Sequence, residues 1–180
     1  IMAPGSTSDI NKDVMKSQFS SLLQTSSIAT TEISQLPLDA VEQLLVDAAG
    51  LTMLDVDVPP SVAVTDANLG DLETLHRCCQ QCDVLKPTMD AAAELLALAA
   101  TDGASCDPVA AGVVLATDVQ GVATQLLQAF NVGMVAVTDG ANGSGLALQG
   151  LNETVHVPGF DGVAQIDATG AGDAYFGGLI

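Results

Sequence analysis

Positive charge is scarce in this 180-residue chain. Against 22 Asp and Glu residues it has only four cations, Lys12, Lys16, Arg77 and Lys86, and its formal net charge is −18. Such a chain would repel nucleic acid and anionic membrane surfaces. We therefore expect no nucleic-acid partner, and we expect any phosphate ligand to be held mainly by backbone amides, a helix N-terminus and a metal ion.

Other features that are rare or absent narrow the class of protein further. The apolar run of residues 91–100 is interrupted by Glu94 and is too short to cross a bilayer, and no apolar stretch is long enough to do so, so we expect no membrane span. Cys79 and Cys82 form a CxxC pair, but no second pair completes a zinc site, which favours free thiols in a reducing compartment. We expect a cytoplasmic protein, and the sequence leaves open an organellar targeting segment before Ile1.

The two ends of the sequence predict an incomplete chain. Residue 1 is Ile rather than Met, and Ile180 falls where a predicted helix has barely started. With 48% hydrophobic residues, the chain is still long enough to form a sizeable core. We expect residues 1–180 to form a single domain that is truncated at both ends.

Apolar segments typical of strands alternate with segments of helical periodicity, which predicts an α/β fold with a mainly parallel sheet covered by helices. Asp118 is expected to cap one helix, and Asp39 with Glu42 to form a capping box at another. The predicted strands are residues 51–58, 83–85, 132–137, 146–148 and 154–157. The predicted helices begin near residues 39, 71, 118 and 170, another contains residues 92–99, and residues 9–23 are a further candidate helix.

The strongest chemical signal is a glycine-rich turn at a helix start, residues 167–173 (DATGAGD). Gly170 and Gly172 let the backbone approach a ligand closely, and the free N–H groups of a helix start face an anion. Asp173 would repel phosphate, so its presence favours a base that accepts a proton from an attacking hydroxyl. The alternative is a first-turn acid that only stabilises the helix through its dipole.

Two segments resemble motifs of the PfkB carbohydrate kinase family. Residues 167–178 (DATGAGDAYFGG) are similar to its second signature, DTxGAGDxFxxG, with Ala168 where the family commonly has Thr. Residues 137–143 (VTDGANG) resemble the TxGxxG motif that lies beside the nucleotide phosphates. The resemblance implies a three-layer α/β/α, ribokinase-like (Rossmann-like) domain, with the N-terminal lid region missing from this chain.

The resemblance also implies an activity, the transfer of the γ-phosphate of Mg-ATP to a hydroxyl of a sugar or nucleoside, with Asp173 as general base. In family members that need a monovalent cation such as K⁺, residues at the positions of Asp167 and Thr169 help to bind it. The implied anion hole is formed by the backbone amides of Gly170, Ala171 and Gly172, and the implied ATP-binding residues are Thr138, Gly140 and Gly143.

One segment departs from the family pattern at its magnesium motif. Lys86-Pro87-Thr88 resembles the KPN that opens the family's NxxE motif, but Thr88 replaces the Asn and Ala91 occupies the position of the Glu. Asp90 is a candidate neighbour for the metal. This departure keeps open a second interpretation, a non-catalytic nucleotide- or sugar-binding relative that retains the fold.

A second segment is also altered. Asp55 and Asp57 stand where many members carry DxNxR at a strand end, and the Arg is absent. We predict that they line the cleft together with Lys86 and Thr88; the alternative is that they are solvent-exposed acids at a strand end. The acceptor is not identified by the sequence, and a homodimer formed through the missing lid is a further expectation.

Overall fold

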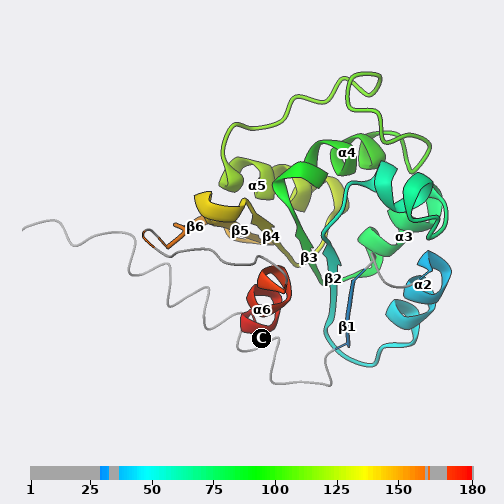
Figure 1. Ribbon diagram of the computed structural model, residues 1–180, viewed down its shortest axis with the longest axis horizontal. Helices are drawn as coiled ribbons and strands as arrows, with labels where there is room; N and C mark the ends of the chain where they lie inside the picture. The colour runs from blue at the N-terminus through cyan, green and yellow to red at the C-terminus, as the bar shows by residue number, and fades with distance from the viewer. Residues whose placement is uncertain (1–28, 33–36, 161, 163–169, 180) are drawn as a thin grey trace, which may run out of the picture.

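The computed structural model describes residues 29–32, 37–160, 162 and 170–179 of the chain. Its centre is a six-stranded sheet whose strands follow one another in chain order (Figure 1). The first four strands are parallel, and the last two are antiparallel to their neighbours. The strands are β1 (Ala29–Glu32), β2 (Thr52–Val56), β3 (Val84–Pro87), β4 (Met134–Thr138), β5 (Ser144–Leu148) and β6 (Val155–Val157).

The helices cover both faces of this sheet. Crossovers between neighbouring parallel strands are right-handed, which places each connecting helix on the same face. Figure 1 shows α2 to α5 on one side of the sheet and α6 on the other. The three-layer α/β/α arrangement predicted from the sequence is confirmed. The helices are α2 (Leu38–Asp47), α3 (Leu72–Gln81), α4 (Met89–Ala100), α5 (Val119–Phe130) and α6 (Ala171–Gly178).

Side-chain alternation along the strands decides which residues face α6. In β2, Leu54 and Val56 belong to the large core beneath α2 to α5, whereas Met53 belongs to the smaller core beneath α6. Because strand side chains alternate with a period of two, Asp55 and the following Asp57 fall on the α6 face. The same alternation in β3 and β4 places Lys86, Thr88 and Thr138 on that face.

Helix caps show both a success and a failure of the sequence analysis. Asp118 caps α5 as predicted, since its Oδ1 accepts a hydrogen bond of 2.7 Å from the backbone N of Gly121. The capping box at Asp39 is wrong. Pro37 is the N-cap of α2, and Glu42 is instead paired with Arg77 of α3 at 2.6 Å. Because α2 begins at Leu38, Asp39 lies within the first turn and not at the N-cap.

Within the described residues, no helix is both long enough and apolar enough to cross a membrane. The longest helices, α4 and α5, have 12 residues each.

Candidate active site

A cavity of about 440 Å³ lies at the carboxyl ends of β2, β3 and β4, on the face of the sheet that carries α6. Ligand sites of parallel α/β sheets occur at this end of the strands, because the connecting loops there can be shaped freely. The cavity wall formed by the strand ends contains four residues that were singled out from the sequence: Asp57, Lys86, Thr88 and Thr138.

The outermost layer of the strand ends is polar. Asp57 follows β2, Thr88 follows β3 and Thr138 ends β4, so the three residues lie at the ends of neighbouring strands. The N–H of Thr88 donates to the carbonyl of Val56 at 3.2 Å, and Thr88 forms a parallel bridge pair with Thr138. Two side-chain oxygens in this layer, Oδ1 of Asp57 and Oγ1 of Thr88, are buried and have no hydrogen-bond partner among the described residues. Unsatisfied buried polar atoms are costly, so they indicate a place where a ligand completes the structure.

One layer deeper, Asp55 and Lys86 form a buried ion pair. Parallel register places them opposite each other on β2 and β3, and Nζ of Lys86 lies 2.6 and 2.8 Å from the two carboxylate oxygens. Both side chains are only 1% exposed. Burial raises the pKa of Asp55 to about 6, although the adjacent Lys86 acts in the opposite direction. The ion pair lies at the bottom of the cavity, where Lys86 is part of the lining. Nζ of Lys86 also lies 5.8 Å from the ring centroid of Phe176 in α6.

The glycine-rich turn after β4 forms another part of the wall. Gly143 has a φ of +97°, and a Cβ there would lie 2.1 Å from the carbonyl oxygen of Val157, so no other residue fits. The turn is closed by a hydrogen bond of 2.9 Å from the N–H of Asp139 to the carbonyl of Gly143. Gly140 and Gly143, which the family resemblance implied as ATP-binding residues, both line the cavity.

The start of α6 faces the same cavity. Gly170 is the N-cap, with a φ of +76°, and the N–H of Ala174 donates to its carbonyl at 2.9 Å to begin the helix. The preceding N–H groups of the first turn have no partner within the helix and are available to an anion. Ala171 and Gly172 line the cavity, and Asp173 is an exposed first-turn acid.

Not every predicted site residue reaches the cavity wall. Asp55 lies beneath it, Gly170 and Asp173 lie at the adjoining helix start, and the predicted cation ligands Asp167 and Thr169 lie outside the described residues. The interpretation of Asp55 as a solvent-exposed acid is wrong, because the residue is fully buried.

Two residues of the altered magnesium motif lie away from the cavity. Asp90 is exposed in the first turn of α4 and is absent from the cavity lining. Ala91 is fully buried in the core between the sheet and α2 to α5. Asp90 is therefore not placed as the metal neighbour that the sequence suggested.

Sequence reasoning missed the wall opposite the strand ends. Ser144 of β5 and Tyr175 of α6 contribute to it, together with residues 157–160 after β6. Phe160 is 93% exposed at this position. The Pro158–Gly159 pair after a predicted strand was a signal for a turn, but nothing in the sequence placed that turn against the glycine turn after β4.

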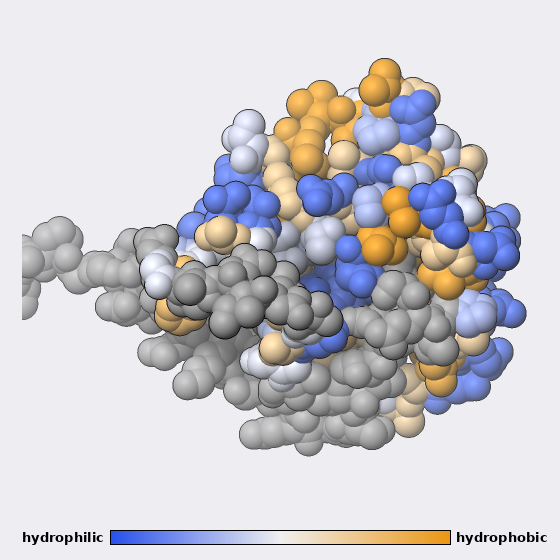
Figure 2. Space-filling model, in the orientation of Figure 1, coloured by the Kyte–Doolittle hydropathy of each residue, from blue (hydrophilic) through white to orange (hydrophobic). Residues whose placement is uncertain are grey.

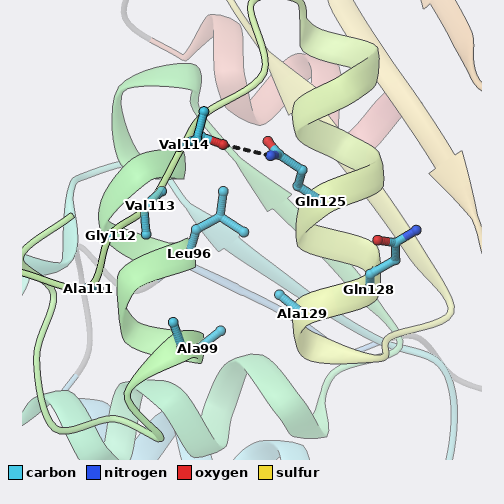
Figure 3. Close-up of a pocket in the computed structure, with 10 residues that line it drawn as sticks. Leu96, Ala99, Ala111, Gly112, Val113, Val114, Gln125, Gln128 and Ala129 are labelled. Atoms are coloured by element: carbon cyan, nitrogen blue, oxygen red, sulfur yellow. Dashed lines mark hydrogen bonds between the residues drawn. The ribbon is translucent and has the colours of Figure 1, made fainter. Parts of the chain in front are cut away.

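A second hollow of about 450 Å³ lies elsewhere, between α4, α5 and residues 111–114 (Figure 3). Nε2 of Gln125 in α5 donates a hydrogen bond of 2.8 Å to the carbonyl of Val114, which holds residues 111–114 against α5. Figure 2 shows apolar side chains gathered over this part of the molecule, and Val109 and Val114 are 89% and 82% exposed. The described lining contains no charged side chain, so this hollow offers no group for acid, base or phosphate chemistry.

Cysteine and histidine contribute nothing to either hollow. Cys78, Cys79 and Cys82 are buried free thiols of the α3 region, and burial raises the pKa of each. Among the residues that the structure describes, no group of three or more His, Cys, Asp and Glu side chains is placed to hold a metal ion.

Comparison with known proteins gives a family match. The model of the pfkB family carbohydrate kinases matches residues 10–180. A search of curated proteins finds no match. The motifs at residues 137–143 and 167–178 lie inside the matched range.

Solved structures match the fold. They include a ribokinase from Thermotoga maritima (21% identity, TM-score 0.55, covering 88% of this chain and 43% of that one). A fructokinase double mutant from Vibrio cholerae O395, in a fructose-, ADP- and potassium-bound form, has 24% identity and a TM-score of 0.55 over 86% of this chain and 44% of its own. Aminoimidazole riboside kinase from Salmonella enterica, complexed with aminoimidazole riboside and an ATP analogue, has 21% identity and a TM-score of 0.53 over 85% of this chain and 46% of its own. The chain thus has a ribokinase-like α/β fold and spans less than half the length of these proteins.

Proposed function

This chain belongs to the pfkB family of carbohydrate kinases, and on that premise we propose that it carries the phosphoryl-transfer site of an ATP-dependent kinase that acts on a sugar or sugar-like hydroxyl. One observation carries the proposal. Two glycine-rich turns about 30 residues apart in the sequence, at Gly140–Gly143 and at Gly170–Gly172, meet beside the cavity, whose floor holds a buried lysine. Backbone amides in glycine-rich turns and a helix start are groups that bind phosphate.

The chemistry proposed for this site is a direct transfer. The acceptor hydroxyl gives its proton to the carboxylate of Asp173, a bond forms between the hydroxyl oxygen and the γ-phosphorus, and the bond to the oxygen that bridges the β- and γ-phosphorus atoms breaks, leaving ADP. The amides of Gly170, Ala171 and Gly172 would stabilise the charge on the transferring phosphoryl group. Asp173 suits this role because it is exposed at the helix start, and none of the ion pairs between described residues involves it.

Nucleotide binding is assigned to the turn after β4. Thr138, Gly140 and Gly143 would lie along the phosphates, and a bound Mg²⁺ would supply positive charge to them. Potassium, present in the fructokinase neighbour, would be held with the help of Asp167 and Thr169 if this protein uses it. The structural neighbours include a ribokinase, a fructokinase and a riboside kinase, which supports a sugar or riboside as the acceptor.

A pair of glycine substitutions on α6 tests the anion hole. A methyl group at Gly172 would lie 3.4 Å from Nζ of Lys86, on a residue that lines the cavity, whereas a methyl group at Gly177 of the same helix meets nothing within 4 Å. Both changes to Ala favour the helix by roughly 1 kcal/mol, so neither should unfold the protein. We expect Gly172→Ala to lower kcat/KM for ATP by about tenfold or more, because small displacements at a transfer site are costly.

The measurement is acceptor-dependent ADP release by the complete protein, with Gly177→Ala as the matched control. Equal activity of the two variants would contradict the assignment of the phosphate site to the start of α6. ATP binding without release for any acceptor would favour the non-catalytic relative instead.

A further inference from the structure

We propose that the hydroxyl of Tyr175 donates a hydrogen bond to the phosphates of the bound nucleotide, and that Ser144 is the residue that orients it. This inference rests on the proposed function, because the nucleotide is the one that the same cavity would bind. Tyr175 stands where the motif DTxGAGDxFxxG has Phe, so the motif accounts for its ring but not for its hydroxyl.

The position of Tyr175 on α6 directs its side chain toward the helix start. Tyr175 follows Ala171 by four residues, and both residues line the cavity. Residues four apart share a helix face, and side chains in a helix lean toward its N-terminus. The half-buried ring packs against the small core that contains Phe176, and the phenol extends back toward Ala171 and Gly172. This is where the transferring phosphoryl group is placed.

The sheet presents further hydroxyl groups to this helix, from the ends of three neighbouring strands. Thr88 forms a bridge pair with Thr138, and Thr138 is in register with Ser144 of β5. Ser144 falls on the α6 face of the sheet, because Leu148 of the same strand belongs to the core beneath α6. These three hydroxyl residues line the cavity together with Tyr175.

Ser144 lies beside the phenol and leaves its proton free. Ser144 is only 3% exposed. Burial raises the pKa of Tyr175, and the neighbouring side chain of Ser144 acts in the opposite direction. A hydroxyl lowers the pKa of a phenol when its proton faces the phenolic oxygen, because it then favours the phenolate. The phenol is protonated at neutral pH and keeps its own proton for an acceptor in the cavity.

The charges around the cavity favour neutral donors for phosphate. Lys86 is the one cation among the described residues of the lining, and it is paired with Asp55 at 2.6 Å. Asp57 adds a negative charge to the same wall. Phosphate oxygens are acceptors, so the protein donors that remain for them are backbone amides and hydroxyls. A hydroxyl that donates to a charged oxygen contributes more than one that donates to a neutral oxygen.

Tyr175→Phe removes the hydroxyl and keeps the ring, so the ligand-free protein should unfold at nearly the same temperature. Calorimetry of the complete protein would measure the binding of ADP with Mg²⁺ and the binding of adenosine, which lacks the phosphates. We expect the variant to bind ADP at least about tenfold more weakly, because a hydrogen bond to a charged acceptor is lost. Adenosine affinity should be unchanged.

Thr124→Val is the matched control, because the hydroxyl of Thr124 donates to the carbonyl of Gln120 within α5 and the residue is outside the cavity lining. Equal ADP affinity of Tyr175→Phe and this control would overturn the proposed contact. An equal loss of affinity for ADP and adenosine would overturn the assignment to the phosphates. Failure of the unmodified protein to bind ADP would instead overturn the proposed function, and the contact with it.

Ser144→Ala is a second test, which also serves if Tyr175→Phe does not fold. We expect it to weaken ADP binding several-fold, because the phenol loses the group that orients it, and unchanged ADP affinity would contradict this. In the double variant, Ser144→Ala should add little to the loss caused by Tyr175→Phe, since residues that act through one contact are not additive. Full additivity would show that Ser144 acts independently and would overturn its orienting role.

Discussion

Replacing Asp173 by Asn is expected to lower kcat by about 10²- to 10⁴-fold, the contribution typical of a positioned general base. An amide cannot accept the proton of the attacking hydroxyl, while the helix start that would hold the phosphoryl group is left in place. ATP affinity should stay close to its original value or increase. Steady-state kinetics of the complete protein, together with calorimetric measurement of nucleotide binding, would separate these two effects.

The control for this prediction is Asp90→Asn. Asp90 is an exposed acid in the first turn of α4, as Asp173 is in α6, so both changes remove a similar interaction with a helix dipole. Equal, small effects of the two variants would mean that Asp173 serves only its helix. A large loss confined to Asp173→Asn would support its role as the base.

The second large effect is expected for the ion pair beneath the cavity. Lys86→Met would leave the carboxylate of Asp55 buried without its partner, and breaking a buried pair in this way costs roughly 3–5 kcal/mol of the free energy of unfolding. The pair is 1% exposed on both sides, so water cannot compensate. Chemical denaturation at neutral pH would measure the loss.

Two further variants make this prediction specific. Replacing both partners, Lys86→Met with Asp55→Leu, should recover most of the lost stability, because an apolar pair of similar volume is often neutral or stabilising. Arg77→Met removes the partly exposed pairs with Glu42 and Glu73 and should cost much less. A double variant that is no more stable than Lys86→Met alone would contradict the account of the pair as mutual compensation.

The periodic segments of the fold were predictable because local rules and packing agree. The buried face of α5, formed by Val119, Val122, Ala123, Leu126 and Phe130, follows directly from spacing and from the cap at Asp118. The capping box at Asp39 failed because α2 begins at Leu38, so Asp39 is not at the N-cap, and Glu42 pairs instead with Arg77, which lies 35 residues further along the chain. Helix propensity contains no information about such a partner.

The site was predictable residue by residue but not as an arrangement. Asp55 and Lys86 were both expected at the cleft, but only the register of β2 against β3 shows that they pair with each other and lie beneath it. The wall formed by Tyr175 and residues 157–160 comes from segments whose own patterns indicate only turns and a helix. Cross-strand register and the docking of loops are long-range properties, which a periodicity cannot specify.

The central claim is that this cavity transfers phosphate from ATP to an alcohol. The most direct measurement is ADP release from Mg-ATP by the complete protein across a panel of sugars and ribosides, with Asp173→Asn alongside. The account predicts release that depends on one acceptor or a narrow group of them and that collapses in the variant. Nucleotide binding without release for any acceptor would contradict it and would leave a non-catalytic member of the family.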